Sequence, residues 1–357
     1  MYIITQIFDQ YSKQGTLAME NMPKLKVGVI GTGALGRHHA RLYAQSPNAE
    51  MIGIFDVQQD AAKKVGAEFG LPVFDKWEEL AAQCDALSVA VPANYHASTT
   101  IPLLEMGKHV LVEKPIAASV DDARAMCEVA AKNQLVLGVG HVERFNPAMD
   151  YLETHLDRPR FIEARRLAAY PPARPGMHRR GTEVSVILDL MVHDLDLVLH
   201  LANSEVESFE VSGSPILSDS EDLVSARIKF VNGCCANVTA SRVSSTLVRR
   251  LQMYQNDKCY DMDFGQITGS TVTSREKSGL VTAEVTLEAK NALAAELEDF
   301  IAAVQQTRIS GRLHDTRVPG IQGYNALKLA VAIENEVRRS NKQYGFELPP
   351  WSPDELA

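Results

Sequence analysis

The sequence predicts an α/β domain with a doubly wound parallel sheet, followed by an α+β domain with a large, open, mainly antiparallel sheet. In the first half, short apolar runs alternate with amphipathic stretches of about ten residues, a pattern typical of βαβ units. In the second half, apolar and polar residues alternate one by one between turn signals such as Asn232-Gly233. A chain of 357 residues is long enough for two such domains.

The apolar runs of the first half define its expected strands. Six runs end by Gly140, and they cover residues 26–31, 51–56, 72–74, 85–92, 109–115 and 135–140. Strands that are apolar throughout are typical of a sheet covered on both faces. We therefore predict a Rossmann domain over residues 25–145, preceded by an N-terminal extension over residues 1–24.

The second half contains alternating strands and three helical stretches. One strongly apolar helix is expected at residues 182–202, and two more are expected at 291–306 and 323–340, after the strands. We assign residues 146–340 to a domain that binds substrate and forms oligomers, and residues 341–357 to a C-terminal tail.

Composition excludes several classes of protein. Hydrophobic residues make up 45% and charged residues 23%, and 36 Lys and Arg stand against 45 Asp and Glu, giving a net charge of −9. Such a chain is a poor nucleic-acid or anionic-membrane binder. No apolar run approaches the ~20 residues of a membrane span, and five Cys without a CxxC pair favour reduced thiols. The N-terminus lacks a secretion signal, so we expect a cytoplasmic protein.

A glycine-rich turn predicts a dinucleotide cofactor. It follows the first strand, opens a helix, and comprises Gly31, Thr32, Gly33, Ala34, Leu35 and Gly36. Glycines there allow the backbone to approach a pyrophosphate, whose charge meets the helix N-terminus. Asp56 ends the next strand about 20 residues later, where an acid accepts ribose hydroxyls and repels a 2′-phosphate. We expect NAD, with NADP less favoured.

Two further strand ends carry a family resemblance. One is the run Val91, Pro92, Ala93, Asn94, Tyr95, His96, and the other is Glu113, Lys114, Pro115. Together with the glycine turn and the antiparallel domain, they resemble the glucose–fructose oxidoreductase / inositol dehydrogenase (Gfo/Idh/MocA) family, over residues 25 to about 340. The resemblance implies that Val91, Pro92, Asn94, His96 and Glu113 line the cofactor site. It also implies that Lys114 contacts cofactor and substrate, with a cis proline placing it.

The apolar helix at 182–202 carries a polar stripe. Asp189, His193, Asp196 and His200 fall within about 60° of one another on a regular helix. A solvent-facing stripe is the usual explanation, but a helix that is apolar around most of its circumference is buried, so the stripe must face a partner or a cleft. The resemblance places Asp189 and His193 beside the nicotinamide, whereas for Asp196 and His200 a structural role is at least as well supported.

These residues suggest a chemistry for alcohol oxidation. A histidine titrates near neutral pH, so His193 is a natural base, Asp189 can orient it, and Lys114 can stabilise the developing alkoxide. Which of Lys114 and His193 takes the proton is left open. No third ligand accompanies Asp189 and His193, so we expect no metal.

A local excess of positive charge suggests the substrate class. Residues 158–180 contain seven arginines and one acid, and arginine forks match phosphate oxygens; a solvated strand or a subunit contact is the alternative. Residues 140–148, 182–184 and 188–196 resemble the branch that contains UDP-N-acetylglucosamine 3-dehydrogenases. That branch implies sugar contacts for Glu143, Arg144 and Asn146, and diphosphate contacts for Arg179 and Arg180.

The predicted function is NAD-dependent oxidation of a secondary sugar hydroxyl, at C3 of a UDP-N-acetylhexosamine. Alternatives are a dehydrogenase of a free polyol or sugar such as inositol, an NAD-retaining glycosidase, and a non-catalytic NAD-sensing protein on the same fold. We also expect a homo-oligomer, either a dimer or a tetramer, because family members pair through the open sheet.

Overall fold

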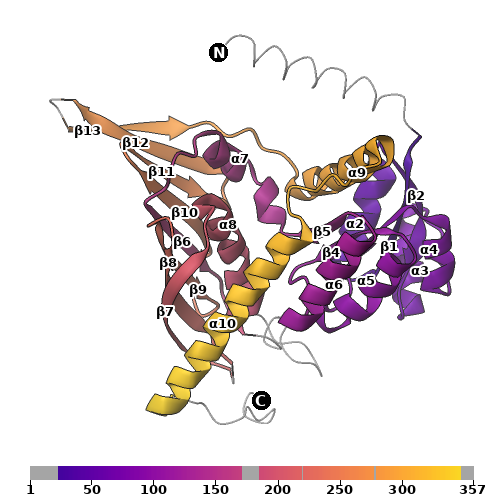
Figure 1. Ribbon diagram of the computed structural model, residues 1–357, viewed down its shortest axis with the longest axis horizontal. Helices are drawn as coiled ribbons and strands as arrows, with labels where there is room; N and C mark the ends of the chain where they lie inside the picture. Colours follow the sequence, from indigo (N-terminus) through magenta and orange to yellow (C-terminus); the bar gives the residue numbers. More distant parts are fainter. Residues whose placement is uncertain (1–22, 171–184, 219, 277–278, 347–357) are drawn as a thin grey trace. The chain divides into compact units, whose positions relative to one another are not determined.

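The computed structural model describes residues 23–170, 185–218, 220–276 and 279–346, and the chain forms two compact units (Figure 1). The first unit contains the chain up to Glu113 together with Glu128–Gly138 and Glu296–Pro319. The second contains Lys114–Cys127, Val139–Ala295 and the chain from Gly320 onward. This division differs from the single boundary expected near residue 145, because the chain passes between the units several times.

The first unit is built on a parallel sheet with strand order β2-β1-β3-β4-β5. Strand β1 pairs in parallel with β2 and β3, and β3 pairs in parallel with β4. The strand order reverses beside β1, which makes the carboxyl ends of β1 and β3 the place where a doubly wound sheet binds its ligand. The bounds are β1 Leu25–Ile30, β2 Ala49–Phe55, β3 Ala86–Val89, β4 His109–Glu113 and β5 Leu137–Gly140.

The sheet has five strands, so the prediction of six was wrong. The run at residues 72–74 makes only an isolated parallel bridge, between Val73 and Ile54. Phe74 donates to the Ile54 carbonyl and Ile54 donates to Pro72. A segment this short, beginning with a proline that has no N–H to donate, cannot extend the ladder further.

Helices cover this sheet, and one of them comes from late in the chain. The early helices are α2 Ala34–Gln45, α3 Gln59–Phe69, α4 Trp77–Gln83, α5 His96–Glu105 and α6 Val120–Lys132. Helix α9, Ala292–Ser310, adds Leu297, Phe300, Ile301 and Val304 to the same core as Val27 and Val29 of β1. The apolar face of α9 therefore explains why residues 296–319 belong to the first unit.

The second unit is built on a mixed sheet of eight strands, in the order β13-β12-β11-β10-β6-β9-β8-β7. The pairing of β6 with β9 is parallel, and the other neighbours pair antiparallel. The bounds are β6 Phe161–Leu167, β7 Val206–Ser214, β8 Leu223–Phe230, β9 Cys235–Ser241, β10 Val248–Gln255, β11 Lys258–Asp263, β12 Thr268–Glu276 and β13 Gly279–Val285. Strand β12 lacks the apolar–polar alternation expected of the second half, because it consists mainly of threonines, serines and charged residues.

Helices pack on one face of this sheet. Exposed and buried residues alternate along β8, as expected for a sheet with one buried face. Helices α7 Pro147–Thr154, α8 Val192–Ala202 and α10 Gly320–Tyr344 lie on this face (Figure 1). Their buried side chains share one core with those of the strands. Ahead of α8, residues Ile187–Met191 form a π-helical turn in place of the regular helix that was expected. None of the helices in the described ranges is long and apolar enough to cross a membrane.

Candidate active site

The predicted glycine turn joins β1 to α2 in the first unit. Gly31 has φ +94°, and a Cβ there would lie 2.5 Å from the Ala90 carbonyl oxygen. A Cβ on Gly36 would lie 1.9 Å from the Gly31 carbonyl oxygen. These two positions require glycine for the turn itself. A Cβ on Gly33 would meet no atom within 4 Å, so Gly33 leaves open space at the N-terminus of α2.

Asp56, just after β2, fixes this turn. Its Oδ2 accepts hydrogen bonds from the Thr32 amide at 2.6 Å and the Thr32 hydroxyl at 2.9 Å, and Oδ1 accepts from the Gln58 amide at 2.8 Å. The carboxylate keeps unused lone pairs, because each oxygen can accept more than one bond. Open space over Gly33, free amides at a helix N-terminus and a carboxylate beside them fit a dinucleotide.

The ends of β3 and β4 carry the other predicted cofactor residues. His96, at the start of α5, is buried, and its Nε2 lies 2.9 Å from the Val91 carbonyl oxygen, whereas Pro92 and Asn94 are exposed. Glu113 ends β4 and lies 3.0 Å from Nε2 of the buried His39. Tyr95, beside them, is exposed. His96 therefore holds the loop after β3 through its contact with Val91, and the exposed Asn94 remains accessible to a ligand.

In the second unit, Lys114 and Asp189 meet. Lys114 Nζ donates to the Asp189 carbonyl oxygen at 2.9 Å and lies 3.6 Å from Asp189 Oδ1. Lys114 follows Glu113 directly, and the Lys114–Pro115 peptide is cis, as the resemblance implies. Asp189 lies in the π-helical turn, and its side chain remains partly exposed. A carboxylate at this distance favours the charged form of a lysine.

His193, in the first turn of α8, is half-buried. Its ring meets His141 edge-on, with ring centroids 6.4 Å apart. Nδ1 is buried and has no hydrogen-bond partner among the described residues. Burial, and then the positive charges of Lys114 and Arg166, hold the pKa of His193 well below its ordinary value. His193 is therefore neutral at neutral pH and able to accept a proton.

Glu143 and Asn146, predicted to contact a sugar, form a buried cluster with Arg166 and Asp194, for which the sequence predicted no such contact. Arg166 of β6 donates to Glu143 at 3.0 Å and forms two hydrogen bonds with Asp194 of α8, at 2.9 and 3.1 Å. Asn146 donates to Glu143 at 3.2 Å. Burial opposes the charge of Arg166, but Asp194 and Glu143 raise its pKa above the ordinary value, so it stays charged. The alternation along β6 is a signal that Arg166 is buried, because it lies on the same face of the strand as Ile162 and Ala164.

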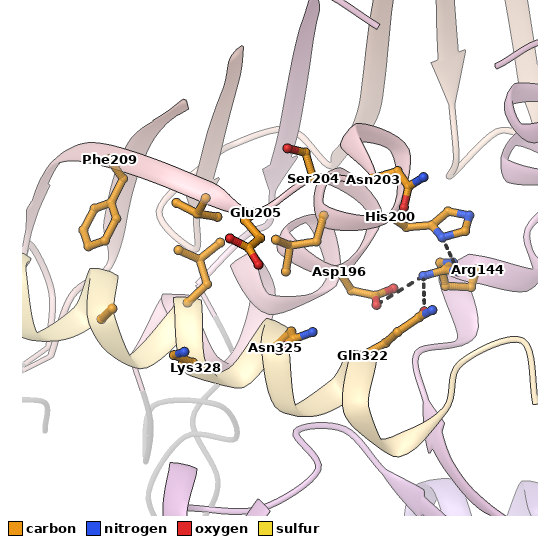
Figure 2. A pocket seen from close by; sticks show the side chains of 14 residues that line it. Arg144, Asp196, His200, Asn203, Ser204, Glu205, Phe209, Gln322, Asn325 and Lys328 are labelled. Atoms are coloured by element: carbon orange, nitrogen blue, oxygen red, sulfur yellow. Dashed lines mark hydrogen bonds and ion pairs between the residues drawn. The ribbon is translucent and has the colours of Figure 1, made fainter. Parts of the chain in front are cut away.

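Arg144 lies in a different cluster, shown in Figure 2. It is fully buried, and it donates to Gln322 at 3.0 Å and to Nδ1 of His200 at 2.7 Å and lies 3.4 Å from Asp196. Since Arg144 donates to Nδ1, the His200 ring carries its proton on Nε2, which lies 2.6 Å from Glu153. These contacts favour a structural role for Arg144, Asp196 and His200, and a sugar contact for Arg144 stays a prediction.

A cavity of about 790 Å³ opens beside this cluster, between α8, the start of β7 and α10 (Figure 2). Its walls include Leu199, Val206, Phe209 and Leu329, and Glu205 and Lys328 also line it. Lys114, Asp189 and His193 are not part of its lining. The predicted diphosphate contacts, Arg179 and Arg180, lie outside the described residues. Within the described ranges, no group of three or more His, Cys, Asp or Glu is arranged to hold a metal ion.

Comparison with known proteins identifies the family. Residues 25–141 match the family model described as an oxidoreductase family with an NAD-binding Rossmann fold, and residues 153–254 match the GFO/IDH/MocA C-terminal domain. The chain belongs to the Gfo/Idh/MocA oxidoreductase family. It is accordingly an oxidoreductase with an NAD-binding Rossmann domain, and a dehydrogenase that acts on CH–OH groups.

Individual relatives in this family differ in substrate. The chain is 33% identical over 328 residues to UDP-N-acetylglucosamine 3-dehydrogenase of Acidithiobacillus ferrooxidans, covering 89% of this chain and 100% of the relative. A solved structure of that enzyme matches with a TM-score of 0.81 over 89% of this chain and 99% of the other. The scyllo-inositol 2-dehydrogenase (NAD(+)) of Bacillus subtilis is 28% identical over 62% of this chain and 68% of its own length. A levoglucosan dehydrogenase complex with NADH, at 19% identity and a TM-score of 0.79 over 89% and 98%, shares the fold.

Proposed function

We propose that this protein oxidises the C3 hydroxyl of a UDP-N-acetylhexosamine with NAD. The observation that carries the chemistry is the grouping of Lys114, Asp189 and His193 in the second unit. The similarity that spans a complete UDP-N-acetylglucosamine 3-dehydrogenase supports the choice of substrate. Small changes in a pocket alter the substrate of such enzymes, so the substrate is the part that most needs a test.

Three side chains perform the proposed chemistry. Neutral His193 accepts the hydroxyl proton through Nε2, because Nδ1 is buried. The Lys114 ammonium donates to the same oxygen and stabilises its developing negative charge. Asp189 holds Lys114 in place through its carbonyl and carboxylate oxygens. The bound NAD supplies the hydride acceptor.

Asp56 supports NAD rather than NADP. Its carboxylate lies at the end of β2, and the next three residues, Val57, Gln58 and Gln59, include no arginine for a 2′-phosphate. A fixed negative charge at this place repels that phosphate. NAD is therefore expected to give the higher kcat/KM, and Asp56→Ser is expected to narrow the difference between the two cofactors.

The direct test follows NADH absorbance with UDP-N-acetylglucosamine and with free myo-inositol. We expect reduction of NAD with the nucleotide sugar, and no activity on any nucleotide sugar would refute the proposal. Lys114→Ala should lower kcat/KM by about 10²–10³-fold and His193→Ala by about 10²–10⁴-fold. Lys132→Ala, which removes an exposed lysine from α6, is the control and should match the parent protein.

The pH dependence supplies a second measurement of the same proposal. His193 acts as a base only when it is deprotonated, and its pKa lies well below the ordinary value of 6.5. The decline of kcat/KM at acid pH should therefore lie below pH 6.5, and kcat/KM should stay constant between pH 6.5 and neutral pH. An acid limb centred above pH 7 would contradict a neutral His193.

A polyol dehydrogenase is the second candidate. The similarity to scyllo-inositol 2-dehydrogenase favours it, although that match covers 62% of this chain. The same lysine, aspartate and histidine could assist the oxidation by NAD of a ring hydroxyl in a polyol that carries no nucleotide group. A kcat/KM for scyllo- or myo-inositol above that for UDP-N-acetylglucosamine would decide for this candidate.

A further inference from the structure

Two arginines face each other across neighbouring strands of the second unit. Arg166 of β6 lies directly opposite Arg249 of β10 in the antiparallel register. Like charges in such a pair repel, so the arrangement needs an anion between them. Glu143 supplies it, because one of its carboxylate oxygens lies 3.0 Å from Arg166 and 3.8 Å from Arg249. Glu143 is thereby held from two strands at once.

Arg166 also holds the start of α8. Its Nε and Nη2 donate to the two oxygens of Asp194, in the bidentate geometry that fixes both partners. Arg166, Asp194 and Glu143 are each less than 10% exposed. Buried charges of this kind keep their geometry because any displacement leaves a charge without a partner.

Asp194 directly follows His193 in the first turn of α8, and the π-helical turn Ile187–Met191 directly precedes α8. π-helical turns are rare and occur frequently at functional sites. We infer that Arg166 is a positioning residue: by holding Asp194 and Glu143, its guanidinium fixes the first turn of α8 and with it the orientation of the His193 ring. This inference rests on the proposed function, in which His193 is the base.

Arg166 has a second, electrostatic effect on His193. The charged and titratable groups around the ring come from several elements, namely Lys114 after β4, His141 after β5, Arg166 of β6 and Arg249 of β10, with Asp189, Asp194 and Glu143 paired to these cations. The cations disfavour a second positive charge on the ring. Removal of the Arg166 charge should therefore make His193 easier to protonate.

Histidine-labelled full-length protein allows a test by NMR without substrate. The His193 signal is assigned by its loss in His193→Gln, and its titration is compared in the parent, Arg166→Gln, Arg166→Lys and Arg165→Gln. Arg165 is the matched control, because it is the preceding residue on β6 but is exposed. We expect His193 to titrate at higher pH in Arg166→Gln alone, and to titrate as in the parent in Arg165→Gln and Arg166→Lys.

Kinetics then separate geometry from charge. A lysine keeps the positive charge but cannot form the fork that grips Asp194 and Glu143 together. Arg166→Lys should therefore lower kcat at least tenfold with KM within about threefold, since a small misplacement of a catalytic group costs up to ~10²-fold. If Arg166→Gln does not fold, Arg166→Lys alone decides the inference.

Two results would overturn the inference. One is a His193 titration in folded Arg166→Gln that matches the parent, and the other is a parental kcat in Arg166→Lys. Failure of the proposed function looks different. In that case the parent protein oxidises no sugar, while the NMR titration still reports whether Arg166 acts on His193.

Discussion

Two consecutive arginines of β6 have opposite environments. Arg165 is exposed, whereas Arg166 is buried between Asp194 and Glu143. Strand alternation alone separates them, because neighbouring residues on a strand point to opposite faces. A count of charges in the sequence treats both arginines as candidates for phosphate binding. In the structure, Arg166 instead binds the carboxylates of Asp194 and Glu143.

The candidate catalytic residues could be predicted because each stands at a recognisable place. Lys114 ends a strand run, and Asp189 and His193 lie four residues apart in an apolar helix. Their partners could not be predicted in the same way. Arg166 and Asp194 meet through the packing of β6 against α8, which no local pattern records. Arg144 carried the same motif signal as Glu143, yet its contacts lie in another cluster.

We predict that the buried His109 of β4 makes the folding stability of the first unit sensitive to acid. It is buried, its Nδ1 accepts from the Val136 amide at 3.0 Å, and burial together with Arg308 lowers its pKa to about 4. The unfolded chain takes up this proton near pH 6.5 and the folded chain only near pH 4, so stability is lost as pH falls through that window. The loss amounts to about 3 kcal/mol at pH 4.

His109→Asn keeps an acceptor for the Val136 amide and removes the titration. Its free energy of unfolding should lie slightly below that of the parent at pH 7.5 and should fall less steeply towards pH 4.5. Urea unfolding at both pH values measures this. Equal losses in parent and variant would show that His109 is not the group responsible.

At the scale of elements, α8 shows what a periodic pattern can and cannot predict. A continuous helix was expected over residues 182–202, and from Val192 the structure is α-helical. The π-turn at Ile187–Met191 was not predicted. A turn widened by one residue has the same amino-acid composition and apolar content as a regular helical turn, so the sequence pattern does not reveal it. The polar stripe calculated for a regular helix consequently splits, with Asp189 beside Lys114 and with Asp196 and His200 beside Arg144.

The glycine turn allows a prediction with an internal control. Gly33 has φ −63°, which alanine adopts readily, and faces open space, whereas a Cβ on Gly36 would clash with the Gly31 carbonyl. Gly33→Ala should fold like the parent but weaken NADH binding by about tenfold, or 1.4 kcal/mol. Gly36→Ala should lower the free energy of unfolding by about 1–3 kcal/mol.

Fluorescence titration with NADH and thermal unfolding measure the two effects separately. A Gly33→Ala protein that binds NADH as tightly as the parent would place the cofactor elsewhere. A Gly36→Ala protein as stable as the parent would mean that the turn relaxes without cost.

At the scale of the whole molecule, the alternation of apolar runs predicted both sheets, including their parallel and antiparallel characters. The errors concern short or polar segments and long-range packing. The expected sixth strand is an isolated bridge at Val73, and β12 shows no apolar alternation. Helix α9 packs on a sheet that precedes it by some 200 residues. The positive charge of residues 158–180 is partly cancelled, because Arg166 is paired with two acids.

We also predict that the open sheet forms a homo-oligomer. The core helices occupy one face of the sheet in the second unit, and on the other face Thr239 of β9 is half-buried. Thr239→Arg should convert a dimer or tetramer into a smaller species in size-exclusion chromatography with light scattering. Thr282→Arg, on the exposed edge strand β13, is the matched control. A monomeric parent protein would contradict the prediction.

The late return of the chain to the first unit has a consequence for biosynthesis. Leu297, Phe300, Ile301 and Val304 complete a core whose other members are made more than 150 residues earlier. A fragment that ends at residue 145 would expose that apolar surface to water and is expected to aggregate. During translation, the apolar core of the nucleotide-binding sheet stays incomplete until α9 has left the ribosome. Although its strands emerge first, the amino-terminal unit can finish folding only after both the strands of the second unit and α9 have been synthesised.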